Sequence, residues 1–240
     1  MSSPGCTAST SSSGRWTGSP ATWRWPIRWP PADPAGRSRP PREPYAMHAA
    51  RDRHAPAGRP SDEIRRWPPV RTAAGSLLLR PVCEERDLPL LSGWMNDPAV
   101  AAFWELAGPA ARTAAHLAAQ RADGHSVPCL GLLDGRPMSY WEVYRADLDP
   151  LARHYAARPH DTGVHLLIGG AEDRGRGVGT ALLRGVADLV LARRSRCGRV
   201  VAEPDVRNAP SLAAFRAAGF RRAADLDLPG KRAALMIRTR

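Results

Sequence analysis

The chain has 240 residues and a net charge of +12, from 35 Lys and Arg against 23 Asp and Glu. This length suits one large domain, or one domain of about 160 residues with an extension. The sequence has no run of about 18 apolar residues and no apolar stretch of about 7 to 15 residues near its N-terminus, so we expect no membrane span and no export.

Cysteine usage indicates a reducing compartment. Cys6, Cys83, Cys129 and Cys197 lie far apart and form no C-x-x-C pair. This spacing predicts neither a zinc site nor a disulfide framework. We therefore expect reduced thiols, no metal and a cytoplasmic protein.

Residues 1–76 read as a low-complexity tail. They are rich in Pro, Ser, Arg and Trp, hold 12 Arg against 5 acidic residues, and lack apolar residues at a period of 2 or 3.6. Such a segment cannot bury enough apolar surface to fold, so we expect disorder or a misassigned start, with translation beginning near Met47. Binding of nucleic acid through its Arg and Trp residues is the less favoured alternative.

Residues 77–240 carry continuous periodic patterns and are expected to form the folded domain. A strand over 77–82 precedes a helix that begins at Glu84 and ends before Pro98, and a second helix covers 110–122. Asp134-Gly135 favours a tight turn, which predicts a hairpin of strands 128–133 and 137–145.

The second half of this domain continues the alternation. After a long loop or short irregular helix over 147–162, we expect a strand (164–169), a helix (177–192), a strand (199–203), a helix (211–218) and two strands (226–228 and 233–237). The order β-α-α-β-β-β-α-β-α-β-β predicts an α+β domain around one mixed sheet.

A glycine-rich segment joins the strand over 164–169 to the following helix: Arg174-Gly175-Arg176-Gly177-Val178-Gly179. Free backbone N–H groups at a helix start bind phosphate, and glycines let the phosphate approach them. The dinucleotide fingerprint fails because Thr180 occupies its last position, and a P-loop fails because no Gly-Lys-Ser/Thr follows.

Two spacings carry a resemblance to a family. R-x-x-G-x-G, at Arg174, Gly177 and Gly179, and a later pattern, Asn208-x-x-Ser211-x-x-x-Phe215-x-x-x-Gly219-Phe220, resemble the GNAT N-acetyltransferase superfamily. The resemblance implies a GNAT-like fold that binds acyl-coenzyme A through Leu167, Ile168, Arg174, Gly175, Arg176, Gly177, Val178, Gly179, Thr180, Asn208 and Phe215. Phe215 stands where many members have a tyrosine that is proposed to protonate the leaving thiolate.

A narrower resemblance covers most of the chain from Leu77 onward. It rests on Trp94-Met95-Asn96-Asp97-Pro98, Phe103-Trp104-Glu105, Tyr140-Trp141-Glu142-Val143-Tyr144, Gly163-Val164-His165-Leu166-Leu167 and Glu203-Pro204-Asp205-Val206-Arg207-Asn208. These segments are similar to the siderophore-biosynthesis branch, with its hydroxylysine N-acetyltransferases of aerobactin-type pathways and its acyltransferases of desferrioxamine-type pathways. The resemblance implies acylation of an N-hydroxyamine, with acetyl-CoA or succinyl-CoA as donor, in the making of hydroxamate iron ligands.

The acceptor implied by the resemblance is N6-hydroxylysine or a diamine such as N-hydroxycadaverine, and the loop over 147–162 favours the diamine. The resemblance also implies that His165 and Asp205 are catalytic, with His165 accepting a proton and Asp205 orienting it or binding the substrate nitrogen. The alternative is structural, because a strand histidine is more often a satisfied core residue and an aspartate before Asn208 often serves a turn.

Aromatic and acidic residues near these positions suit a cationic, flexible substrate. We expect Trp104, Glu105, Tyr140 and Glu142 to bind it. Strand alternation places Tyr140, Glu142 and Tyr144 on one face and Trp141 on the other.

Two other functions remain open from the sequence. An aminoglycoside 6'-N-acetyltransferase would share the fold and the Trp-x-Asn-Asp-Pro-like segment. A non-catalytic acyl-CoA-binding module would be consistent with Phe215. Nothing in the sequence indicates the oligomeric state.

Overall fold

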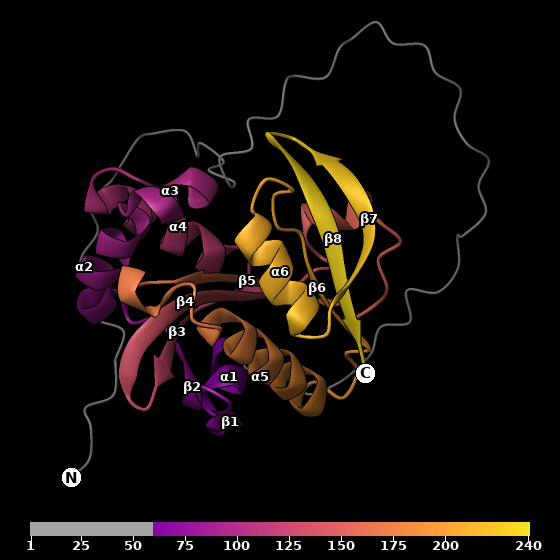
Figure 1. Cartoon of the computed structure of the whole chain (residues 1–240), viewed down its shortest axis with the longest axis horizontal. Helices are drawn as coiled ribbons and strands as arrows, with labels where there is room; N and C mark the ends of the chain where they lie inside the picture. The colour runs from indigo at the N-terminus through magenta and orange to yellow at the C-terminus, as the bar shows by residue number, and fades with distance from the viewer. Residues whose placement is uncertain (1–59) are drawn as a thin grey trace, which may run out of the picture.

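The computed structural model describes residues 60–240, which form one mixed sheet with helices on both faces (Figure 1). The helices are α1 (Pro60–Arg65), α2 (Glu84–Met95), α3 (Pro98–Trp104), α4 (Ala110–Ala122), α5 (Val178–Arg193) and α6 (Ala209–Ala217), with short 3₁₀ turns η1 (Pro150–Arg153) and η2 (Ala171–Asp173). The strands are β1 (Val70–Thr72), β2 (Gly75–Pro81), β3 (Ser126–Leu133), β4 (Arg136–Arg145), β5 (Thr162–Ile168), β6 (Arg199–Ala202), β7 (Arg221–Leu228) and β8 (Lys231–Thr239).

The strands lie in the order β1-β2-β3-β4-β5-β6-β8-β7. All neighbours are antiparallel except β5 and β6, which pair in parallel. The predicted α+β class, with one mixed sheet flanked by helices, is confirmed. Asp134 and Gly135 form the predicted β3–β4 turn, with φ of 48° and 82°.

Two hydrophobic layers hold the helices against the sheet. On one face α1, α5 and α6 cover a cluster that includes Trp141, whereas on the other face α2, α3 and α4 cover a cluster that includes Tyr140. Trp141 and Tyr140 are both fully buried. The predicted alternation of β4 is therefore confirmed.

The folded unit begins before the boundary expected at Leu77. Within the segment assigned to the tail, α1 and β1 are present, and Ile64 and Trp67 are buried in the core under β2. The segment that contains α1 and β1 has too few apolar residues to show a period of 2 or 3.6 in the sequence. Its place in the folded unit comes from packing of Ile64 and Trp67 against the sheet. Residues 1–59, including Met47 and the remainder of the predicted tail, lie outside the described residues.

The helix expected to end before Pro98 does so, but Pro98 then begins a further helix, α3. The Asp97 side chain caps α3 by accepting the backbone N–H of Ala99 at 2.9 Å, and proline is well suited to the first helical position. This short helix carries Trp104 over the sheet.

The loop over 147–162 contains the 3₁₀ turn η1 and is fastened to β6 at its end. The buried carboxylate of Asp161 accepts hydrogen bonds from Arg199 Nε at 2.9 Å and from the Tyr155 hydroxyl at 3.0 Å.

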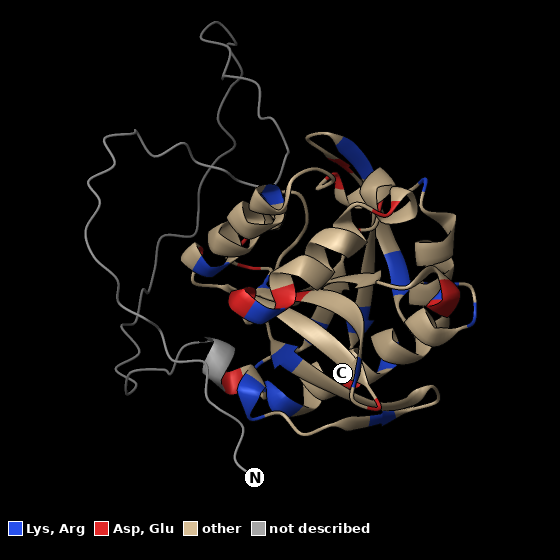
Figure 2. Ribbon diagram, turned by 90° about the vertical axis from the view of Figure 1, so that its left-hand side faces the viewer, with Lys and Arg blue, Asp and Glu red and all other residues tan. Residues whose placement is uncertain are grey.

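In the view of Figure 2, basic and acidic residues are interspersed along the ribbon rather than gathered by sign.

Candidate active site

The glycine segment forms the turn that opens α5. Gly175 and Gly177 have φ of 71° and 78°, a left-handed conformation that residues other than glycine rarely adopt. Gly177 is the N-cap of α5, so the N–H groups of the first helical turn, from Val178 on, point out of the helix end without intrahelical acceptors. An anion such as a pyrophosphate fits this turn, because the helix dipole adds to these donors.

Arg174 belongs to the scaffold of this turn. Its guanidinium donates to the backbone oxygens of Ile168 (3.0 Å) and Gly169 (2.6 Å) and to Asp97 Oδ1 (2.9 Å). It therefore ties the end of β5 to the start of α3. Arg176, by contrast, is exposed beside the turn, where its charge faces solvent.

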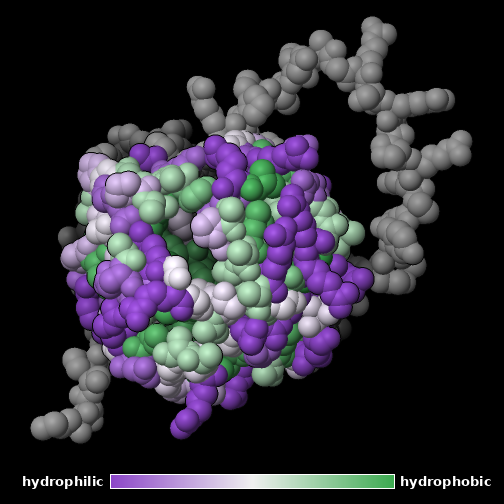
Figure 3. All heavy atoms as spheres, in the orientation of Figure 1, coloured by the Kyte–Doolittle hydropathy of each residue, from purple (hydrophilic) through white to green (hydrophobic). Residues whose placement is uncertain are grey.

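The sheet opens beside the glycine segment. β5 and β6 are paired only at Thr162 with Val200 and at Gly163 with Val201, and the two strands diverge after these pairs. The space-filling view shows the molecule hollowed on the face over these strands (Figure 3). The Leu167 side chain is buried and Ile168 packs against the core under α5, so these residues would meet an extended ligand mainly through their backbone.

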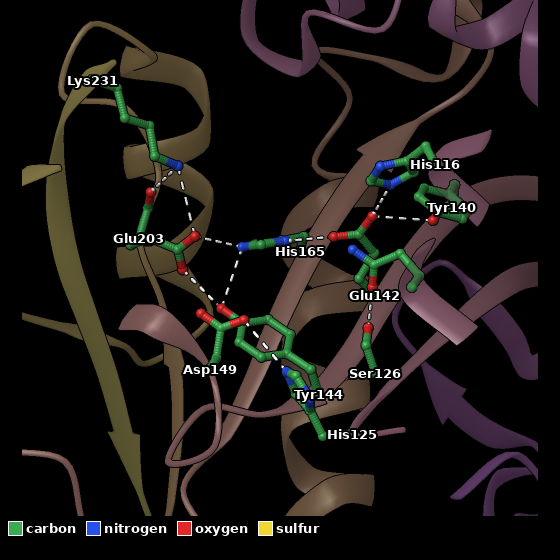
Figure 4. Close-up of polar contacts among 11 residues, drawn as sticks. His116, His125, Ser126, Tyr140, Glu142, Tyr144, Asp149, His165, Glu203 and Lys231 are labelled. Carbon is green, nitrogen blue, oxygen red and sulfur yellow. Dashed lines mark hydrogen bonds and ion pairs between the residues drawn. The ribbon is translucent and has the colours of Figure 1, made fainter. Parts of the chain in front are cut away.

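His165 lies in this opening between two carboxylates (Figure 4). Its Nδ1 is 2.7 Å from Glu142 Oε2 on β4, and its Nε2 is 2.5 Å from Glu203 Oε1 at the end of β6. The His165 side chain is 15% exposed, against 1% for Glu142 and 6% for Glu203. The histidine is therefore the part of this group that a ligand in the opening can reach.

Further polar groups surround the two carboxylates. Glu142 Oε1 lies 2.6 Å from His116 Nε2 on α4 and accepts from the Tyr140 hydroxyl at 3.1 Å. Glu203 Oε2 accepts from the Tyr144 hydroxyl at 3.0 Å, and Glu203 Oε1 is 3.6 Å from Lys231 Nζ. We call this group the carboxylate-histidine cluster; its members are His116, Tyr140, Glu142, Tyr144, His165, Glu203 and Lys231.

A glycine makes room for one member of the cluster. A Cβ added at Gly163 would come within 2.1 Å of the Tyr144 ring. The ring can therefore lie flat across β5 and deliver its hydroxyl to Glu203 only because position 163 has no side chain.

The electrostatics of the cluster favour the charged forms of Glu142, His165 and Glu203. Burial alone would raise the pKa of Glu142, but the neighbouring His116 and the hydrogen bonds of both histidines outweigh it and hold that pKa well below its usual range. Burial alone would likewise raise the pKa of Glu203, yet the charges of His165 and Lys231 lower it to about 2. For His165, burial opposes protonation, but the charge of Glu203 and the hydrogen bonds to both carboxylates raise its pKa to about 10.

The structure pairs His165 with Glu203, whereas the sequence suggested Asp205. The Asp205 carboxylate instead accepts from the side chain of Arg207, at 2.7 Å from Nη2, and from the backbone N–H of Arg207, at 2.7 Å. The hydrogen bond with Arg207, together with smaller contributions from its charge, lowers the pKa of Asp205. Asp205 thus shapes the loop after β6, while Glu203, two residues earlier, reaches the histidine.

Asn208 and Phe215 also have structural contacts. The Asn208 side chain caps α6 by accepting the N–H of Ser211 at 3.1 Å. Phe215 is buried and lies edge-on against Phe220, with ring centroids 5.0 Å apart. The helix that follows Asn208 is thereby fixed beside the opening.

The expected substrate-binding residues divide into exposed and buried ones. Trp104 borders the cluster, with its ring 5.4 Å from that of Tyr140 and 6.3 Å from that of His165. Glu105 is exposed next to it, in the left-handed conformation that ends α3. Tyr140 and Glu142 are buried behind His165, so their contact with a ligand would pass through the histidine.

Sequence reasoning missed the roles of Glu203, His116, Tyr144 and Lys231. Glu203 had a signal, because it ends a buried strand within a segment that carried the resemblance, and a carboxylate there needs a partner. His116 lies on an amphipathic helix and Lys231 on an edge hairpin, and the sequence patterns of both elements indicate the fold alone.

Within residues 60–240, no group of His, Cys, Asp and Glu is arranged to hold a metal ion, and no helix has the length and apolar character needed to span a membrane.

Comparison with known proteins gives consistent matches. Residues 84–228 match the family described as "Acetyltransferase (GNAT) domain". An N(6)-hydroxylysine O-acetyltransferase from Escherichia coli is 35% identical over 184 residues, which are 76% of this chain and 58% of that protein. The lysine N-acyltransferase MbtK of Mycobacterium sp. (strain MCS) is 36% identical over 73% of this chain and 72% of its own length.

A solved structure of AAC(6')-Ib in complex with paromomycin and acetyl-CoA superposes with a TM-score of 0.62 at 25% identity, covering 68% of this chain and 93% of that one. The chain spans little more than half of the E. coli relative but most of the other two proteins. The residues of the family match, 84–228, include the glycine segment, the opening between β5 and β6, and every member of the cluster except Lys231.

Proposed function

Because the chain belongs to the acetyltransferase (GNAT) family, we propose that it transfers an acyl group from coenzyme A to the hydroxylated nitrogen of a lysine-like or diamine chain. The observation that carries this proposal is the position of His165, at the opening of the sheet, between the carboxylates of Glu142 and Glu203. Glu105, exposed beside Trp104 at the end of α3, suits a flexible substrate with a cationic far end.

The acyl donor would occupy the glycine segment and the edge of β5. The amides from Arg176 to Thr180 would hold the pyrophosphate, and the pantetheine arm would run along the backbone of Leu167 and Ile168 toward His165. Family membership supports acyl-coenzyme A as donor. We propose acetyl-CoA or succinyl-CoA, because both share this pyrophosphate site.

The acceptor would enter between α3 and the loop after β6. Trp104 would cover its methylene chain, and Glu105 would meet the distal ammonium or α-amino group. The relatives named above are described as acting on lysine and N6-hydroxylysine, which are chains of this length and charge.

An acceptor and donor panel tests the proposal. Coenzyme A release would be measured with N-hydroxycadaverine, N6-hydroxylysine and kanamycin, each with acetyl-CoA and succinyl-CoA, and the products identified by mass spectrometry. We expect a hydroxamate from at least one hydroxyamine and a much lower kcat/KM for kanamycin. Turnover of kanamycin alone would support the aminoglycoside alternative, and release with none of the acceptors would refute acyl transfer to amines of these classes.

A further inference from the structure

Each ring nitrogen of His165 faces a carboxylate oxygen. A neutral imidazole has one N–H and one lone pair, so a neutral His165 would direct a lone pair at one of the two carboxylates. The distances of 2.7 Å to Glu142 and 2.5 Å to Glu203 leave no room for an intervening water. The pKa values of Glu142 and Glu203 are lowered, so both carboxylates are ionised, and only the imidazolium, with two N–H groups, then satisfies both contacts (Figure 4).

The groups around the carboxylates stabilise this arrangement. Those that face Glu142 and Glu203 come from α4, β4 and β8: His116, Tyr140, Tyr144 and Lys231. The hydroxyl of Tyr144 also lies 3.3 Å from His165 Nε2, and burial together with Glu203 raises the pKa of that tyrosine, so it remains a donor. Each carboxylate is thus held ionised by donors on its far side while it faces the histidine.

We propose that Glu203, together with Glu142, is a positioning residue that keeps His165 cationic, and that this cation makes the enzyme select a neutral hydroxylated nitrogen over an alkylammonium. The inference rests on the proposed function. It assigns His165 the role of a fixed positive charge that orients and discriminates, in place of the proton acceptor expected from the sequence.

The chemistry of the two acceptors gives the discrimination. An alkylamine with a pKa of about 10.4 is neutral in only about one molecule in 2,500 at pH 7. The other molecules carry an ammonium, and the imidazolium of His165 has no lone pair with which to take its proton. The oxygen of an N-hydroxyamine withdraws electrons from nitrogen, so this nitrogen is largely neutral at pH 7 and can attack at once.

The transfer balances without a net proton from the cluster. The nitrogen lone pair forms the new C–N bond, the thioester C–S bond breaks, and the sulfur leaves with the bonding pair. The nitrogen loses one proton and the thiolate gains one, so coenzyme A leaves as a thiol.

Because the selected acceptor already carries oxygen on its nitrogen, the reaction that supplies it must be an oxidation of the amine that precedes acylation.

The first test measures the charge of His165 directly in the full chain. Nitrogen-15 NMR of labelled histidine, titrated from pH 6 to pH 9, reports whether one or both ring nitrogens carry a proton. We expect His165 to remain doubly protonated over this range. A His165 signal that becomes singly protonated at about pH 6.5, the ordinary value for histidine, overturns the inference without any variant.

The second test compares N-hydroxycadaverine with cadaverine, using acetyl-CoA, in the wild type and in Glu203→Gln. We expect the wild type to prefer the hydroxyamine by about a hundredfold or more in kcat/KM at pH 7. Because cadaverine reacts through its neutral fraction, this preference should fall by about tenfold per pH unit up to pH 9. Glu203→Gln removes one of the two stabilising charges, so the preference at pH 7 should shrink by at least about tenfold and the NMR signal of His165 should titrate.

Glu85→Gln is the matched control, because it makes the same chemical change at an exposed carboxylate in the first turn of α2. It should leave both the preference and the NMR titration as in the wild type. An unchanged preference in Glu203→Gln refutes the selection by His165 but leaves acyl transfer intact. Absence of coenzyme A release with either acceptor in the wild type refutes acylation of this acceptor class. The NMR titration still decides whether His165 is cationic, because it does not depend on turnover.

Discussion

Gly177→Ala offers a sharp test of the donor site, because this glycine combines a left-handed conformation with open space. Its φ is 78°, and a Cβ added there meets no atom of the protein within 4 Å. Gly230, in the turn between β7 and β8, has a φ of 89° and equally open space. Gly230→Ala therefore introduces the same backbone strain away from the glycine segment.

The strain can be estimated from the backbone alone. An alanine in the left-handed region costs about 1 to 2 kcal/mol, and the lost freedom of the unfolded chain returns about 0.4 to 1 kcal/mol. Each variant should therefore lower the free energy of unfolding by about 1 kcal/mol, measured by urea denaturation. Only at position 177 would the methyl group stand beside the N–H groups that face a pyrophosphate.

The assay that separates the two variants is coenzyme A binding by isothermal titration calorimetry. We expect Gly177→Ala to raise the Kd by about tenfold, which corresponds to about 1.4 kcal/mol, and Gly230→Ala to change it by less than about twofold. Equal Kd values for the two variants, with equal losses of stability, would show that the glycine segment does not hold the pyrophosphate.

Three further predictions follow from the contacts of single residues. Arg174→Lys should lose about 1 to 3 kcal/mol in urea unfolding, because a lysine cannot reach Ile168, Gly169 and Asp97 together; unchanged stability would contradict the bracing role. Phe215→Ala should lose about 3 to 5 kcal/mol, since this residue is 5% exposed; a loss below about 1 kcal/mol would place the ring outside the core. The raised pKa of His165 stabilises the fold fully below its ordinary value of 6.5, and this contribution is lost as the pH rises toward about 10. The urea midpoint should therefore decline over this pH range in the wild type and decline less in His165→Ala, and parallel curves would argue against the shift.

Local patterns were sufficient for much of the fold. The Asp134-Gly135 turn, the start of α5 at the glycine segment and the closing of α6 before Gly219 follow from residues that are neighbours in sequence. The structure and the family match confirm these elements and the resemblance on which the acyltransferase prediction rested. The alternation of β4 is another local property, because successive side chains on a strand always point to opposite faces.

The cluster could not be predicted in this way. His165 meets Glu142 through the pairing of β4 with β5, and it meets Glu203 because β5 and β6 diverge after two residue pairs. The resemblance favoured Asp205, but the nearby Arg207 engages its carboxylate. A side chain two positions away in sequence thus decided which carboxylate reaches the histidine.

The sequence by itself determined the family, the phosphate-binding turn and the order of elements, since each depends on spacings of a few residues along the chain. The tertiary structure decided that Ile64 and Trp67 belong to the core, that Arg174 braces the turn and that His165 lies between two carboxylates. The reason is physical: the charge state of a buried histidine depends on the groups brought within hydrogen-bonding distance by strand pairing, and these groups are 23 and 38 residues away in sequence.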